Sequence, residues 1–318
     1  MDIAYAVLLL VGPDDCEIDR ANDLLDAIGA WEPAPCRMIV IDDSAQDRVL
    51  KQRLTFPEQV EPAFLVFSRP RGLIFRKAKG VCGNSLLGFQ WVARYAREAA
   101  FSMKIDTDAL VIAPFAQKLT REFAAHPAVG VLGANTRTPE GYERDFTRNA
   151  GLMKSLHAHP DDWRKPRSLI NYAKEWINGS ATRMIRKHLS AAVRAGYEYG
   201  ENCLGGAYAI RQSCIAEMNR RGYLDHPEHW TAIDVPEDVM MHMYARAAGY
   251  CLKNYVSPGD VFGIRLTGLP FLLHELPDKG YSVIHSVKND KRYSEAEVRE
   301  FFRNQRRGEH VRQRRLSG

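Results

Sequence analysis

The chain has 318 residues, of which 45% are apolar and 26% charged, and its 44 basic and 39 acidic residues give a formal net charge of +5. This is the balance of an ordinary globular protein, and we expect one dominant domain. A net charge this small gives no general case for a polyanionic partner. The cysteines form no CxxC pair and no zinc-like spacing, so we expect reduced, mostly buried thiols rather than a structural zinc site.

The first half of the chain alternates apolar runs with segments of helical spacing. The run at 4–11 is closed by Gly12-Pro13, which is typical of a strand buried on both faces of a parallel sheet. The whole pattern predicts strands at 4–11, 37–41, 63–67, 101–105 and 129–135 and helices at 18–28, 84–100 and 115–125. A mostly parallel α/β sheet with right-handed crossovers follows from this order.

The composition and the spacing of apolar residues change where the second half of the chain begins. Residues 145–200 carry two tryptophans, many basic residues and helical spacing, which predicts a helical insertion. The later predicted elements are strands at 203–210 and 250–256, helices at 212–221 and 237–248, and apolar segments at 271–276 and 281–287. We therefore expect a single domain over 1–290, followed over 291–318 by a C-terminal helix and a flexible, arginine-rich tail.

Two aspartates interrupt the apolar pattern after the strand that begins at Phe101. Asp106 and Asp108 are one residue apart, so in an extended segment both carboxylates lie on the same side and can share one cation. Carboxylate oxygens suit Mg²⁺ or Mn²⁺, which keep positions open for diphosphate oxygens. Such pairs often only cap a helix or face solvent. The flanking apolar segments favour a metal site, because buried charges need partners.

Three further features are candidates for contact with a bound nucleotide. Asp42 and Asp43 end an earlier strand at the same sheet edge, where they could accept hydrogen bonds from a base or ribose or, equally, cap a helix. Lys79 precedes a helix and could neutralise a diphosphate, although basic loops are usually solvated. Gly205-Gly206 would let the backbone approach a flat ligand, but a simple bulge would also use glycine.

Acidic and histidine side chains later in the chain complete the candidate site. Glu237 and Asp238 open a helix, where the macrodipole alone favours negative charge. Asp238 is our candidate general base for an acceptor hydroxyl, and Glu237 is the second candidate. His285 ends an apolar run, where a histidine more often belongs to the core, yet imidazole is a competent Mn²⁺ ligand. His274 ranks second for that role.

The order of these motifs resembles the GT-A fold glycosyltransferases. An early strand ends in Ile41-Asp42-Asp43 and a later one in the segment KIDTDALVI. The segment LGGAY at 204–208 looks like a glycine-rich acceptor-side strand. The segment PEDV at 236–239 is similar to the EDV motif of the inverting β-1,3-galactosyltransferase-like members. Family 2-like members share the general pattern.

The resemblance implies a fold, an activity and residue roles. The fold would be Rossmann-like, a mixed and mostly parallel sheet flanked by helices. The activity would be transfer of a sugar from a nucleotide-diphosphate sugar, a UDP-sugar first of all, to an acceptor hydroxyl, with inversion in a single displacement. Asp108 would ligate Mn²⁺ (or Mg²⁺), Asp106 would bind ribose or metal, and His285 would be a late ligand. Asp238 would be the base.

Two departures from the family leave the acceptor undefined. Ala207 stands where members often have an aromatic residue or a third glycine, and the insertion at 145–200 matches no family segment. The acceptor is therefore expected only to be a saccharide or a lipid-linked group.

Other classes of function remain open. A sugar-phosphate nucleotidyltransferase would also use acidic metal ligands, but the acidic, proline-containing segment 12–15 suits triphosphate binding poorly. A non-catalytic basic module would act through the arginine-rich stretch 303–315 on a polyanion or an anionic membrane surface. No specific nucleic-acid partner is expected. The N-terminal run is too short to span a membrane and lacks a basic leader, which predicts a cytoplasmic protein. Peripheral contact at the inner face of the membrane would come from the arginine-rich tail.

Overall fold

The computed structural model describes residues 3–12, 14–43, 50–66, 81–158, 179–232 and 235–316. A seven-stranded sheet has the order β3-β2-β1-β4-β7-β6-β8, and a small sheet has the order β5-β10-β9. The strands of the large sheet are β1 (Tyr5–Val11), β2 (Cys36–Asp42), β3 (Val60–Val66), β4 (Phe101–Asp106), β6 (Val129–Gly133), β7 (Ala207–Arg211) and β8 (Cys251–Asn254). Those of the small sheet are β5 (Leu110–Val111), β9 (Phe262–Ile264) and β10 (Val283–His285).

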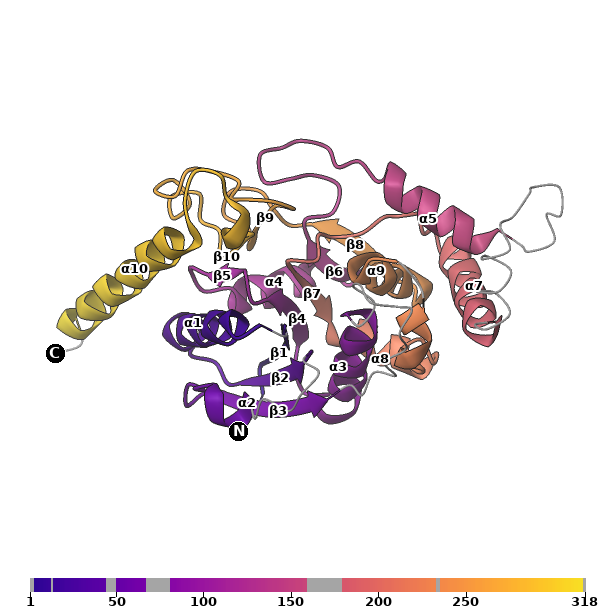
Figure 1. The fold of residues 1–318 in the computed structure, drawn as a ribbon, viewed down its shortest axis with the longest axis horizontal. Coiled ribbons are helices and arrows are strands. Elements are labelled where there is room, and N and C mark those ends of the chain that lie inside the picture. Colours follow the sequence, from indigo (N-terminus) through magenta and orange to yellow (C-terminus); the bar gives the residue numbers. More distant parts are fainter. Residues whose placement is uncertain are drawn as a thin grey trace.

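Helices cover both faces of the large sheet (Figure 1). They are α1 (Cys16–Trp31), α2 (Leu50–Arg53), α3 (Val81–Tyr95), α4 (Ala116–Ala125), α5 (Thr147–His157), α7 (Gly179–Arg194), α8 (Gln212–Arg220), α9 (Glu237–Ala247) and α10 (Glu295–Leu316), with short 3₁₀ turns η1 (Pro227–Ala232) and η2 (Val287–Asn289).

The continuous apolar run of β1 reflects burial on both sides. Successive side chains of a strand point to opposite faces, so Leu8 and Leu10 enter the core beneath α3, α8 and α9. Val7 and Leu9 enter the core beneath α1 and α4. Strands β3, β2, β1 and β4 are parallel, while β7 runs antiparallel to both of its neighbours. The predicted fold class, a mixed and mostly parallel α/β sheet flanked by helices, is confirmed.

Strand β7 begins later than the sequence suggests. It starts at Ala207 rather than at 203, because Gly205 and Gly206 form a turn that precedes the strand. The backbone amide of Leu204 is already bonded to the carbonyl oxygen of Ala134, 3.0 Å away, outside the ladder. The two glycines therefore lie at the edge of the sheet rather than within a broken strand.

Two short strands and the C-terminal helix were harder to predict. β5 and β9 have two and three residues, too few to show periodicity. The backbone is helical from Glu295 to Leu316, so α10 includes the arginine-rich stretch. Val298 and Phe302 bury this helix against the small sheet. Within the described residues, no helix has both the length and the apolar character needed to cross a membrane.

The described parts of the expected insertion are helical. α7 packs on α9, and its Ile185 and Leu189 are buried in the core on that side of the sheet (Figure 1). Residues 159–178, which belong to the same expected insertion, and Lys79 lie outside the described residues. The cysteines are free thiols, with Cys16 and Cys251 exposed and the others buried.

Candidate active site

The carboxyl ends of β2, β1 and β4 lie side by side. In the strand register, Asp42 is opposite Val11 of β1, and Asp106 is opposite Leu10 of the same strand. Because neighbouring strands are about 4.8 Å apart, the backbones of the two aspartates are roughly 10 Å apart at one edge of the sheet. Open α/β sheets bind ligands at this edge.

The small sheet brings His285 to the aspartate turn. β5 begins two residues after Asp108 and pairs with β10, where Ile284 is opposite Leu110. The amide of Val287 then donates to the carbonyl oxygen of Asp108 at 3.1 Å. Asp106, Asp108 and His285 each offer one ligand atom, and these atoms lie within 4.8 Å of one another. Asp108 and His285, which are nearly 180 positions apart in sequence, thus lie side by side at this turn.

Asp108 is buried, with 5% of its side chain exposed, and is surrounded by donors. Nε2 of His285 is 3.3 Å from Oδ1, while the Ser286 hydroxyl donates to Oδ2 at 2.7 Å and Lys288 Nζ lies 3.1 Å from the same oxygen. Burial acts to raise the pKa of Asp108, but these donors outweigh it and hold the pKa well below its usual range. The carboxylate is therefore ionised.

The imidazole of His285 is held in one orientation. Its Nδ1 lies 2.8 Å from the carbonyl oxygen of Arg265 and must donate to it, because a carbonyl only accepts. Nε2 is left facing Asp108. Burial acts to lower the pKa of His285, but the hydrogen bond to Asp108 outweighs it and raises the pKa. A fixed Nδ1–H, with Nε2 directed towards the candidate cation site, is the usual arrangement of a histidine metal ligand.

Lys104 is a member of the site that the sequence reasoning missed. Its buried ammonium is 2.5 Å from Oδ1 of Asp106 and donates to the carbonyl oxygen of Gly205 at 2.6 Å, with Oε2 of Glu237 at 3.7 Å. Burial acts to lower the pKa of Lys104, but the Asp106 and Glu237 carboxylates outweigh it and raise the pKa. A signal was present: Lys104 and Asp106 are two residues apart on a strand, hence on the same face.

Glu237 and Asp238 differ in their burial and in their hydrogen-bond partners. Glu237 is buried and accepts a hydrogen bond from the Tyr208 hydroxyl, and burial raises its pKa even though Lys104 opposes the rise. Asp238 is partly exposed. Its Oδ2 accepts from Asn202 Nδ2 at 2.6 Å and its Oδ1 from the amide of Val239 at 2.9 Å. Burial also raises the pKa of Asp238, against the effect of Lys104.

The residues present fit a small divalent cation. Mg²⁺ ligands lie about 2.1 Å from the ion, so two ligands of one ion are roughly 3 to 4 Å apart. The ligand atoms of Asp106, Asp108 and His285 lie within 4.8 Å of one another, and Nε2 of His285 is 3.3 Å from Oδ1 of Asp108. Two carboxylate oxygens with one imidazole suit Mn²⁺ or Mg²⁺. Asp106, at 36% side-chain exposure, is far more open than Asp108. A cation bound here would therefore face the solvent on the Asp106 side.

No protein-family model matches this chain, and no curated protein matches it in sequence. Among solved structures, it is similar to the apo structure of WbbM, a bifunctional glycosyltransferase, with 14% identity and a TM-score of 0.44 over 92% of the chain. The match covers 47% of WbbM, so the chain spans about half the length of that protein. A likeness of this size does not assign a function, and the side chains must carry the assignment.

Asp43 and His274, which the sequence also suggested, do not belong to the group formed by Asp106, Asp108 and His285. Asp43 accepts a hydrogen bond from Asn84 Nδ2 of α3 at 2.7 Å, so it joins β2 to that helix. His274 is exposed in a turn and is not part of the group formed with the aspartates. A second group of possible ligands, His226, Glu228 and His229, lies at η1, where His226 and Glu228 are exposed. Because η1 packs against α3, this group belongs to another part of the molecule.

Proposed function

We propose that this chain is a metal-dependent glycosyltransferase of the GT-A type, which transfers a sugar from a nucleotide-diphosphate sugar to an acceptor hydroxyl. One observation carries the proposal: the ligand atoms of Asp106, Asp108 and His285 lie within 4.8 Å of one another. Lys104 links this group to Glu237, the neighbour of Asp238. A candidate cation site and a candidate base thus share one edge of the sheet, where open α/β sheets bind ligands.

The donor side of the site would be built from the aspartate turn and its neighbours. Asp106, Asp108 and His285 would hold Mn²⁺ or Mg²⁺, which neutralises charge on a departing nucleoside diphosphate when it is bound. Lys288, 40% exposed beside Asp108, would contact diphosphate oxygens. Asp42 and Asp43 would accept hydrogen bonds from the ribose or from a base N–H, and we propose a UDP-sugar as the donor. Gly205 and Gly206 would border the sugar.

The acceptor side would depend on Asp238. Its carboxylate would take the proton from the acceptor hydroxyl as that oxygen attacks the anomeric carbon, and the configuration would invert. The amide of Asn202 and the backbone amide of Val239 orient this carboxylate. Burial raises the pKa of Asp238, which makes it a stronger base than an exposed aspartate. A saccharide or a lipid-linked group would be the acceptor.

The rival functions have weaker support. A basic binding module would act through the arginines of 303–315, yet two of these, Arg303 and Arg306, are bonded to the carboxylate of Asp23. Such a module would also have no use for a buried lysine surrounded by carboxylates. A sugar-phosphate nucleotidyltransferase would need a basic loop after β1, where Asp14 and Asp15 stand instead. Peripheral contact with an anionic membrane through α10 stays part of the proposal only for a lipid-linked acceptor.

Thermal unfolding tests the proposal. The melting temperature should rise with one nucleoside-diphosphate sugar, and only when Mn²⁺ or Mg²⁺ is present, since a ligand that binds the native state stabilises it. Asp108→Ala should abolish this shift, whereas Asp278→Ala, which removes an exposed aspartate in a turn, should keep it. A shift of equal size with excess chelator, or an unchanged shift in Asp108→Ala, would contradict the metal assignment.

A further inference from the structure

An arginine of the C-terminal helix contacts the aspartate turn directly. Nη2 of Arg299 donates to the backbone carbonyl oxygen of Thr107 at 3.1 Å, although the two residues are 192 positions apart. Thr107 lies between the two candidate metal ligands. Its carbonyl group shares a peptide plane with the amide nitrogen of Asp108. A contact that fixes this oxygen therefore restricts the backbone from which the Asp108 side chain projects.

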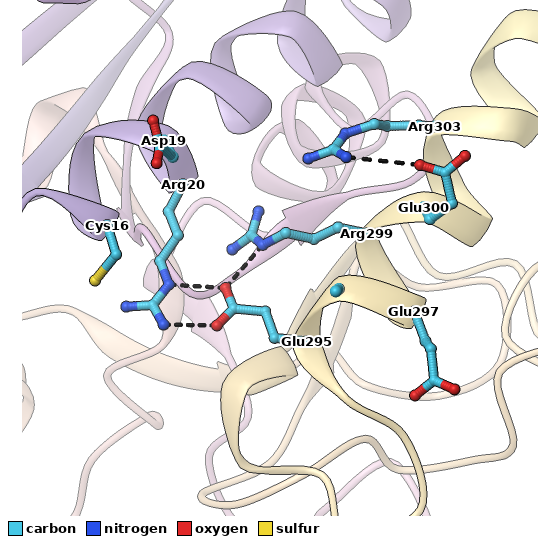
Figure 2. A pocket seen from close by; sticks show the side chains of 9 residues that line it. Cys16, Asp19, Arg20, Glu295, Glu297, Arg299, Glu300 and Arg303 are labelled. Atoms are coloured by element: carbon cyan, nitrogen blue, oxygen red, sulfur yellow. Dashed lines mark hydrogen bonds and ion pairs between the residues drawn. The ribbon is translucent and has the colours of Figure 1, made fainter.

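The guanidinium of Arg299 is itself fixed on the other sides. Only 7% of its side chain is exposed, Nη1 donates to Asp23 Oδ2 of α1 at 2.8 Å, and Nε donates to Glu295 Oε1 at 2.8 Å. Because a guanidinium is a rigid planar fork, two such partners determine where the remaining donors point. Figure 2 shows Arg299 between α10 and α1, with Glu295 joining it to Arg20.

A second connection reaches the same threonine from the other side. The Thr107 hydroxyl donates to Oε2 of Glu17, and Oε1 of Glu17 accepts from Arg20 Nη1 at 2.5 Å. Arg20 in turn donates to both oxygens of Glu295, at 2.7 and 2.6 Å (Figure 2). Both the carbonyl and the hydroxyl of Thr107 are therefore connected to the first turn of α10.

We propose that Arg299 is a positioning residue of the metal site, and that its hydrogen bond from α10 to the Thr107 carbonyl oxygen sets the separation of the Asp106 and Asp108 carboxylates. This inference rests on the proposed function, because it assigns the turn a metal. A purely structural arginine of α10 would bind Asp23 without contacting the aspartate turn. Arg306 binds the same carboxylate, with Nη2 2.7 Å from Asp23 Oδ1, but within the part of the chain that the structure describes it makes no hydrogen bond to Thr107.

The surroundings of Arg299 make substitution feasible. A groove of about 720 Å³ lies between α1 and α10 and is lined by Arg20, Glu295 and Arg299, among others (Figure 2). The space left by a truncated side chain would join this open groove, where water can enter and bond to the freed carboxylates of Asp23 and Glu295. Arg299→Ala should therefore fold.

Two measurements on metal-free full-length protein test the inference. Mn²⁺ affinity by titration calorimetry should fall about tenfold or more in Arg299→Ala, the usual effect of losing a group that orients a metal ligand, and remain close to wild type in Arg306→Ala. Hydrogen exchange at the Ala109 amide, which donates to the Asp106 carbonyl oxygen at 3.0 Å, should accelerate in Arg299→Ala only. Arg299→Lys should fall between, because an ammonium cannot contact all three partners as the fork does.

The outcomes separate this inference from the proposed function. Equal effects in Arg299→Ala and Arg306→Ala, or no effect in either, would overturn the positioning role even if wild type binds Mn²⁺. If Ala109 exchange accelerates only in Arg299→Ala while wild-type protein binds no Mn²⁺, the positioning of the turn stands and the metal-dependent function fails.

Discussion

The imidazole of His285 packs directly against the backbone of Gly206. A Cβ atom added at Gly206 would lie less than 3.0 Å from three atoms of that ring, a distance that real Cβ atoms essentially never show. At the neighbouring Gly205 an added Cβ would be 3.5 Å from Cβ of Asp238, which is ordinary van der Waals contact. The two glycines that look equivalent in sequence therefore have different tolerances. Only Gly206 is required for the position of His285.

Gly206→Ala should weaken Mn²⁺ binding, because the imidazole must move away from Asp108 to admit the methyl group. Gly205→Ala is the matched control and should keep a metal affinity close to wild type. Titration calorimetry with Mn²⁺ alone measures both. Equal affinities in the two variants would show that His285 contributes nothing to the cation site.

Asp238→Asn should reduce sugar transfer by roughly 10² to 10⁴-fold while leaving donor affinity intact, because only the proton acceptor is lost. Single-turnover kinetics and calorimetric donor binding separate the two effects. Glu237→Gln should instead lower stability, since Lys104 and the Tyr208 hydroxyl both rely on that carboxylate. A product that retains the donor's anomeric configuration would refute the role given to Asp238.

The sequence predicted the sheet better than it predicted the site. β1 and β2 are continuous apolar runs, and such runs report burial on both faces directly. Asp106 and Asp108 were identifiable because charges interrupt such a run. The approach of His285 to them was not predictable from spacing, since it depends on the pairing of β10 with a two-residue strand. Lys104 was not predicted, because a lysine is buried in a strand only with carboxylate partners, and one of these, Glu237, lies far along the chain.

The ion pairs that hold α10 against α1 could not be predicted from the sequence either. The arginine-rich stretch looks like solvated charge when it is considered alone, yet its Arg306 is bonded to Asp23, 283 positions earlier in the chain. Asp23 faces inward from α1 with 3% of its side chain exposed, at a helical position where a local pattern gives no sign of its partners. Long-range ion pairs of this kind depend on how two helices dock, which hydrophobic periodicity does not specify.

Lys104→Met should lower the free energy of unfolding by about 3 to 5 kcal/mol, the usual cost of removing one partner of a buried ion pair. The reason is that Asp106 and Glu237 would lose the cation that faces them. Lys253→Met is a suitable comparison, because the Lys253–Glu122 pair is less buried than Lys104 and should contribute less to the free energy of unfolding. Urea unfolding of both variants gives the two values. Similar losses would mean that Lys104 is not a required counter-ion of the carboxylates.

Stability should depend on pH through His188. Burial, assisted by Lys187, lowers the pKa of His188 to about 4 from its ordinary 6.5, and its ring packs edge-on against Tyr223 and Tyr244. Between these two pH values the unfolded chain binds a proton that the folded chain does not. The free energy of unfolding should therefore fall as the pH falls from 6.5 towards 4, by up to about 1.4 kcal/mol per pH unit from this group.

His188→Phe keeps an aromatic ring against the two tyrosines and removes the titrating group, so its stability should decline less steeply than that of wild type over the same pH range. Urea midpoints measured across that range give both slopes. His242, whose pKa burial lowers to about 3, should maintain part of the decline in the variant. Identical slopes in wild type and variant would mean that His188 is protonated in the folded protein as readily as in the unfolded chain.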